Sequence, residues 1–119
     1  MIPHNRPTIG LEEQKAAIRV LESGNLSNGI EVSSFEKEFA KYMNLGGDEA
    51  VAVSNGTSAL FLSLWVLNAN SKKIVFPSYV CSALRHAVGM INGTEIILDN
   101  SKNSPNINQN KMKNVSHDV

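Results

Sequence analysis

The sequence has a single cysteine, Cys81, so an internal disulfide is excluded. Neither sign of charge is in excess, because eleven Lys and Arg residues balance eleven Asp and Glu residues without clustering. This balance gives no indication of a nucleic-acid or anionic-membrane surface. The longest apolar run, around residues 60–67, is far shorter than the roughly 20 residues that cross a bilayer, and the first residues lack the apolar core of a signal peptide. We therefore expect a cytoplasmic protein with no nucleic-acid or membrane partner.

Helical and strand patterns alternate along the chain. Four segments have the apolar spacing or end signals of helices: residues 11–23, 33–43, 57–67 and 81–90. Three short apolar segments predict strands: residues 50–53, 73–76 and 95–98. Strands that alternate with helices favour crossover connections and a mostly parallel sheet. The sequence therefore predicts an α/β fold.

The composition changes after residue 99. Residues 100–119 contain six Asn, four Lys or His and few apolar residues. A segment of this composition buries too little apolar surface to offset the entropy lost on ordering. We therefore divide the chain into a folded part, residues 1–99, and a polar, disordered tail, residues 100–119.

A glycine turn connects the predicted strand 50–53 to the helix that follows it. Asn55-Gly56 is a turn dipeptide, and Thr57 or Ser58 can cap the helix. Backbone N–H groups at a helix start lack partners within the helix and lie at the positive end of its dipole, so they stabilise an anion. Gly56 allows close approach of the backbone. From spacing alone an ordinary turn is the simpler interpretation, and the segment matches no nucleotide fingerprint.

The predicted helix 57–67 is apolar on almost every side, and only Ser63 interrupts a run of Leu, Phe, Trp and Val. A helix that is apolar all round must be covered all round. Three short strands and three other helices can cover one face of it. We therefore expect the other face to contact a further part of a longer chain or a second subunit.

Five motifs follow one another in order: Ile2-Pro3 with Pro7, residues 21–29 (LESGNLSNG), residues 35–40 (FEKEFA), residues 53–60 (VSNGTSAL) and residues 76–79 (FPSY). This series resembles the amino-terminal third of the DegT/StrS family of pyridoxal-phosphate-dependent nucleotide-sugar aminotransferases. The resemblance covers residues 2–108. It implies part of the large domain of a fold-type I transferase, whose active sites form between the two subunits of a homodimer.

The resemblance implies transamination with pyridoxal 5'-phosphate as cofactor. An amino group would pass from an amino acid, usually glutamate, to a nucleotide-linked keto sugar, for surface polysaccharide or amino-sugar biosynthesis. Gly56, Thr57 and Ser58 fall on the family's phosphate-binding turn. Four residues after Pro77, where many members place an aromatic ring on the cofactor's pyridine, this chain has Cys81. Its polarizable sulfur could still pack against a ring, whereas a small core residue at a helix start is an equal alternative.

Three further residues are candidates for contact with a ligand. Ser27 and Gly29 lie in a loop that the resemblance places near the active site and the dimer contact, which makes them substrate-binding candidates. Asp99 ends the third predicted strand, where ligands collect in such sheets, and a turn explains it equally well. We assign no catalytic residue and no metal ligand. The family's Schiff-base lysine and pyridine-pairing acid have no match in this chain, so we expect it to be inactive alone.

Three hypotheses follow from these observations. The first is a fragment of an aminotransferase. The second is a small α/β module that keeps the phosphate turn and binds a phosphorylated ligand without chemistry. The third is a structural partner that lends its apolar helix to a longer homologue.

Overall fold

A computed structural model of the chain describes residues 2–47 and 49–119. It separates into two compact units, Met1–Ala52 and Val53–Val119, which are described one at a time. This division differs from the one expected at residue 99. Within the described residues, no helix combines the length and the apolar character needed to cross a membrane.

The first unit contains the helices α1 (Leu11–Ser23) and α2 (Ile30–Tyr42). The bounds of α1 match the prediction. Its first turn is closed by the Gly10 N–H, which donates to the Glu13 carboxylate at 2.6 Å. Its end is set by Gly24, which adopts the left-handed backbone (φ 72°) that glycine tolerates best.

Helix α2 begins earlier than predicted. Its N-terminal cap is Gly29, and the Ser33 N–H donates to the Gly29 carbonyl at 3.2 Å. The Ser33–Glu36 pattern therefore lies inside the helix, and the expectation that it starts the helix is wrong. An ion pair between Arg19 and Glu31, at 3.0 Å, joins the two helices.

The strand expected over residues 50–53 is not formed. Val51 is 79% exposed, and no described segment pairs with this stretch as a neighbouring strand. The Ala52 N–H instead donates to the Glu36 carboxylate at 2.8 Å. The prediction of a strand here is wrong, because a strand also needs a partner for its N–H and C=O groups.

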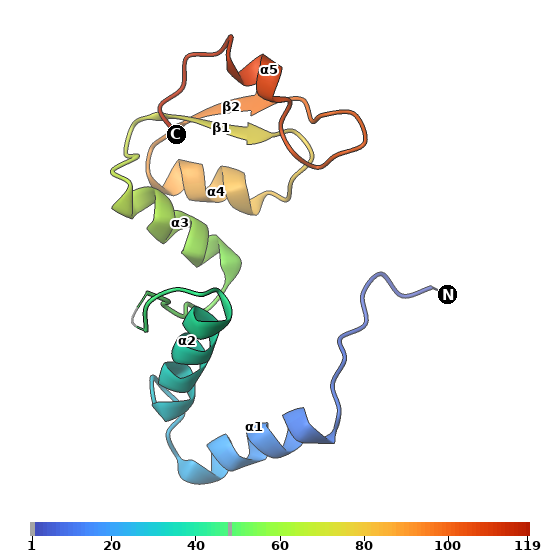
Figure 1. The fold of residues 1–119 in the computed structure, drawn as a ribbon, viewed down its shortest axis with the longest axis vertical. Helices are drawn as coiled ribbons and strands as arrows, with labels where there is room; N and C mark the ends of the chain where they lie inside the picture. Colours follow the sequence, from blue (N-terminus) through green and yellow to red (C-terminus); the bar gives the residue numbers. More distant parts are fainter. Residues whose placement is uncertain (1, 48) are drawn as a thin grey trace. The chain divides into compact units, whose positions relative to one another are not determined.

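The second unit is built on a parallel sheet, as predicted. Strands β1 (Lys73–Pro77) and β2 (Thr94–Leu98) pair in parallel, with Lys73 opposite Thr94 and Pro77 opposite Leu98. Helix α4 (Ala83–Met90) connects them and lies along the sheet, and α3 (Gly56–Val66) packs against α4 (Figure 1). The arrangement is the expected α/β one, with two strands rather than three among the described residues.

The core of this unit joins both helices to the sheet. Its buried side chains are Leu64, Ala69, Ile74, Phe76, Ala87, Val88 and Ile91. Only one side of α3 contributes to it, because Leu64 is buried whereas Trp65 and Val66 are 63% and 71% exposed. Within this unit, the other side of the apolar helix is uncovered, as its composition led us to expect.

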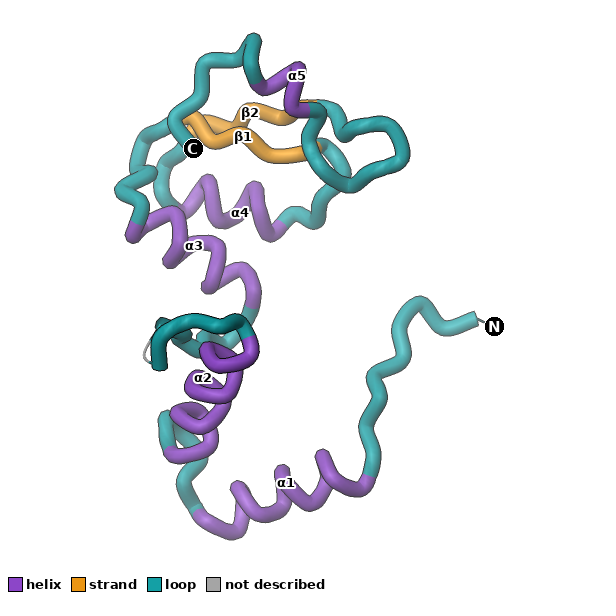
Figure 2. The backbone as a smooth tube through the Cα atoms, in the orientation of Figure 1, coloured by secondary structure: helices purple, strands orange, loops and turns teal. Residues whose placement is uncertain are grey.

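The segment after β2 has more structure than expected. Figure 2 draws most of it as loop, with the short helix α5 (Gln109–Met112) near its middle. Asn100 and Ile107 form an isolated bridge, and the Val75 N–H donates to the Val119 carbonyl at 2.9 Å. The expectation of disorder relied on the scarcity of apolar residues. It left out the local hydrogen bonds that asparagine side chains supply.

Candidate functional site

The start of α3 is capped by Asn55. Its backbone is extended, and its side-chain oxygen accepts the Ser58 N–H at 2.9 Å. The expectation that Thr57 or Ser58 caps this helix is therefore wrong. Asparagine caps as well as serine does, and its longer side chain reaches the third N–H of the helix. The Asn55 amide nitrogen also donates to the Ser54 hydroxyl at 3.1 Å, which fixes the turn from both ends.

Two backbone donors at this helix start have no acceptor among the described residues. They are the N–H groups of Gly56 and Thr57, the first two positions of α3. A Cβ added at Gly56 would meet no atom within 4 Å, so the space in front of it is open. The backbone of Gly56 is not left-handed, and glycine is therefore not required here by its φ angle.

The chemistry of this group of donors suits an anion. Two free N–H groups lie beside the hydroxyls of Thr57 and Ser58, and the first turn of α3 has no acidic side chain. Phosphate oxygens are acceptors that such a turn can satisfy, with the helix dipole adding a favourable charge interaction. The residues of the turn therefore fit a phosphate group.

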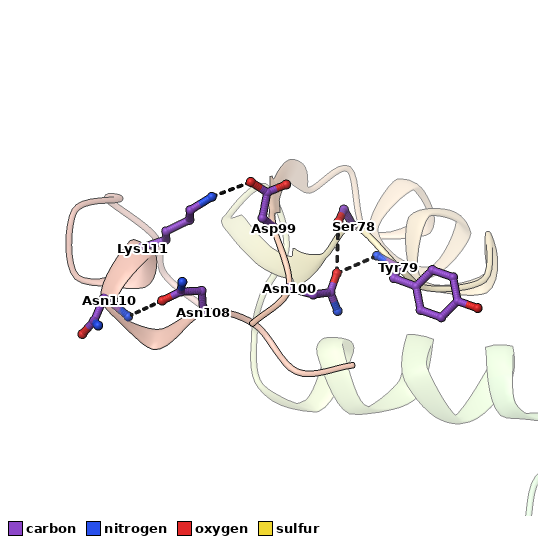
Figure 3. Close-up of polar contacts among 7 residues, drawn as sticks. All are labelled: Ser78, Tyr79, Asp99, Asn100, Asn108, Asn110 and Lys111. Atoms are coloured by element: carbon purple, nitrogen blue, oxygen red, sulfur yellow. Dashed lines mark hydrogen bonds and ion pairs between the residues drawn. The ribbon is translucent and has the colours of Figure 1, made fainter. Parts of the chain in front are cut away.

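Cys81 lies in the loop between β1 and α4. It is exposed and is not part of the core of this unit. The loop is fastened to the end of β2: the Ser78 N–H donates to the Leu98 carbonyl at 2.8 Å, and Asn100 accepts hydrogen bonds from Ser78 and Tyr79 (Figure 3). Sequence reasoning missed Asn100. Its one signal was a polar residue two positions after the end of a predicted strand.

The turn at Gly56 and the loop that carries Cys81 lie on the same side of the second unit. Helices α3 and α4 both begin on the side at which the strand arrows end (Figure 1). Ligands of parallel sheets bind outside the carboxyl ends of the strands. The packing of α3 against α4 thus places the start of α3 and the loop before α4 on the same side of this unit (Figure 1).

Asp99 follows β2 at the same edge but has an ion-pair partner. Its carboxylate pairs with the Lys111 ammonium of α5 (Figure 3). The hydrogen bond from Lys111, with the attraction of its charge, holds the pKa of Asp99 below its ordinary value. The Asn108 N–H also bonds the Asp99 carbonyl at 3.2 Å. The turn interpretation accounts for Asp99 without a ligand.

Ser27 and Gly29 belong to the first unit. Both line a groove of about 410 Å³ between the end of α1 and the start of α2, together with Arg19, Leu26 and Ile30. Gly29 is also the cap of α2. The groove contains apolar side chains and one ion pair, so it offers both kinds of contact to a ligand. Among the described residues, no cluster of His, Cys, Asp or Glu is placed to hold a metal ion.

Comparison with known proteins gives a consistent result. The model of the DegT/DnrJ/EryC1/StrS aminotransferase family matches residues 7–116. The spore coat polysaccharide biosynthesis protein SpsC of Bacillus subtilis is 34% identical over 113 residues, which are 94% of this chain and 28% of SpsC. The chain thus spans little more than a quarter of the length of this relative.

Solved structures resemble the chain over a similar share of their length. The aminotransferase TlmJ of Streptoalloteichus hindustanus is 31% identical, with a TM-score of 0.77 over 83% of this chain and 27% of TlmJ. The putative sugar aminotransferase Spr1654 of Streptococcus pneumoniae, in its PLP form, has a TM-score of 0.85 over 95% of this chain and 29% of its own. At 20% identity the second likeness concerns the fold alone. With the family model matching nearly all of its residues, the chain belongs to the DegT/DnrJ/EryC1/StrS aminotransferase family.

Proposed function

We propose that this chain forms the phosphate-binding part of an aminotransferase that uses pyridoxal 5'-phosphate. The whole enzyme would transfer an amino group from an amino acid, glutamate in our proposal, to a nucleotide-linked keto sugar for polysaccharide biosynthesis. The observation that carries the proposal is the start of α3, where Asn55 caps the helix and the N–H groups of Gly56 and Thr57 find no acceptor in residues 2–47 and 49–119. Membership of the family and the likeness to SpsC support the reaction class.

Each residue of the turn has a distinct task in this proposal. The N–H groups of Gly56 and Thr57 donate to phosphate oxygens, and the hydroxyls of Thr57 and Ser58 add two further donors. Asn55 binds no ligand but takes up the Ser58 N–H, which orients the turn. When bound, the cofactor supplies an electron sink, and the protein's contribution is to position and orient it.

Two further contacts complete the proposal. Cys81 packs its sulfur against the cofactor ring at the position where many relatives place an aromatic side chain. Ser27 and Gly29 contact the substrate from the groove of the first unit. In the whole enzyme we propose a cytoplasmic homodimer, whose second subunit and further residues supply the lysine and the acid that have no match here.

Binding measurements test the proposed phosphate site at the start of α3. We expect pyridoxal phosphate and inorganic phosphate to bind the chain with roughly millimolar affinity, and pyridoxal, which lacks the phosphate, to bind much more weakly. Thr57→Val should weaken both phosphate ligands roughly fivefold, because it removes one hydrogen bond worth about 1 kcal/mol. Ser63→Ala is the matched control, since the Ser63 hydroxyl bonds the Ala59 carbonyl on the same helix away from the turn. Equal binding of pyridoxal and pyridoxal phosphate would contradict the proposal.

The catalytic part of the proposal has its own test. We expect no glutamate-dependent amination of a nucleotide keto sugar by the 119-residue chain, because loss of a covalent catalytic group removes most of the rate enhancement. Amination above the rate without protein would mean that these residues hold a complete catalytic site.

A further inference from the structure

Asn100 is the half-buried polar residue on which two segments of the second unit meet. It lies two residues after the end of β2, and its side chain faces the loop that leaves β1 (Figure 3). Its oxygen accepts the Ser78 hydroxyl at 3.0 Å and the Tyr79 N–H at 3.1 Å. Its amide nitrogen donates to the Pro105 carbonyl. Both ends of the amide are thus used, and each end binds a different segment.

The loop held in this way has few other attachments. Residues 79–82 are all exposed, and the Ser82 side chain makes no cap for α4. Apart from the bonds of α4 itself, the hydrogen bonds that fix the described residues 78–81 are the one from Ser78 to Leu98 and the two to Asn100. Among the described residues, Asn100 is therefore the one side chain outside this loop that bonds it, at a point two residues before Cys81.

We propose that Asn100 is a positioning residue for the ring-binding side of the cofactor site. It fixes the loop of residues 78–82 so that Cys81 stands beside the ring of a cofactor whose phosphate is held at the start of α3. This inference rests on the proposed function. The inference adds to the site a residue that acts by holding the loop of residues 78–82. Because Asn100 also bonds the Pro105 carbonyl, the turn of residues 100–107 supports the site as well.

The affinity for pyridoxal phosphate divided by the affinity for inorganic phosphate is the ratio that tests this role. Inorganic phosphate reports on the turn at Gly56 alone, whereas pyridoxal phosphate reports on the turn and the ring contact together. We expect the wild-type chain to bind pyridoxal phosphate more tightly than inorganic phosphate. Asn100→Ala removes both bonds that the loop makes to this side chain, so it should lower the ratio roughly fivefold without changing the affinity for inorganic phosphate.

Three companion variants sharpen the test. Asn100→Asp keeps an oxygen that accepts from Ser78 and Tyr79, so it should restore most of the ratio. Ser78→Ala removes one of the two bonds by a milder change and should give a smaller fall, which serves as the readout if Asn100→Ala does not fold. Asn110→Ala changes an asparagine whose side chain takes no part in these contacts and should leave the ratio unchanged.

The outcomes separate the two proposals. Two results would overturn the role of Asn100 and leave the proposed phosphate site in place. One is a ratio near one in the wild type, and the other is an unchanged ratio in Asn100→Ala and Ser78→Ala while phosphate still binds. Absence of binding by either ligand would overturn the proposed function and this inference with it. A fall in the ratio with restoration by Asn100→Asp would support both.

Discussion

Asparagine shapes much of this chain at the scale of single residues. Among the described residues, non-glycine positions with positive φ are mostly asparagine: Asn44, Asn68, Asn92 and Asn103, with Ser71 as the exception. Asparagine tolerates this backbone better than most residues do. Asn55, Asn100 and Asn108 instead accept backbone N–H groups with their side chains. The polar composition that suggested disorder therefore also supplies turns and caps.

Gly93 is the glycine that packing requires most clearly. A Cβ at this position would lie 2.7 Å from the Ile74 side chain and 2.9 Å from the Val88 side chain, both in the core. We expect Gly93→Ala to destabilise the fold by about 1–3 kcal/mol through overpacking, measured by denaturant unfolding. Gly89→Ala is the control, because a Cβ there meets nothing and alanine favours a helix. Equal stability of the two variants would contradict this packing argument.

The ion pair of Asp99 and Lys111 predicts a local pH dependence. Because Lys111 lowers the pKa of Asp99 in the folded chain, the pair stabilises the fold above the ordinary aspartate pKa of about 3.9. That stabilisation is lost as the pH falls through the lowered value, and it is small because both groups are exposed. An NMR titration of the Asp99 carboxylate should return to the ordinary pKa in Lys111→Met. The same midpoint in both proteins would exclude this cause.

At the scale of elements, sequence patterns were reliable where the chain completes its own hydrogen bonds. The helix at residues 11–23 has its stop signal in Gly24, and the strands at 73–76 and 95–98 differ from the structure by one residue at an end. The segment 50–53 did not become a strand because pairing is not a local property. Helix α2 starts early because Gly29 provides its cap, a role that the Ser33–Glu36 pattern obscured.

The candidate site was predictable in part for the same reason. The start of α3 follows from a local turn signal, although the capping residue was assigned wrongly. Asn100 could not be found in this way, because its contacts with Ser78 and Tyr79 cross 22 and 21 residues of sequence. The roles of Cys81, Ser27 and Gly29 rest on resemblance and stay predictions.

Asn55 separates the stability of α3 from its binding of anions. Asn55→Ala should cost about 1 kcal/mol of stability through loss of the cap. Asn55→Asp keeps an acceptor for the Ser58 N–H, so it should unfold like the wild type. Its negative charge should nevertheless weaken phosphate binding at the neighbouring N–H groups of Gly56 and Thr57. Denaturant unfolding and phosphate titration of both variants check this, and unchanged phosphate affinity in Asn55→Asp would contradict it.

At the scale of the whole molecule, the main feature is the apolar surface of α3 that the second unit leaves open. The exposed side chains include Leu62, Trp65, Val66 and Leu67. A patch of this kind marks an interface or a risk of aggregation. It agrees with a chain that matches little more than a quarter of the length of its relatives, and it keeps the structural-partner hypothesis open beside the proposed function.

This surface predicts self-association. We expect the chain to form oligomers whose proportion rises with concentration in sedimentation velocity, because burying apolar side chains is favourable. Trp65→Gln should shift the distribution towards monomer. Tyr79→Gln, which changes a more exposed aromatic residue outside α3, should not. A wild-type chain that sediments as a monomer at every concentration would contradict this prediction, because the apolar face of α3 would then stay exposed to water.

The central claim is that the start of α3 binds phosphate through its backbone. Amide chemical shifts recorded during a titration with inorganic phosphate test it most directly, because each N–H reports separately. The account predicts saturable shifts centred on residues 55–59, with the largest at Gly56 and Thr57, and loss of these shifts in Gly56→Val, whose side chain would fill the open space that the ligand needs. Shifts scattered over the lysine residues, or no shifts at all, would contradict the account and reduce this turn to an ordinary helix cap.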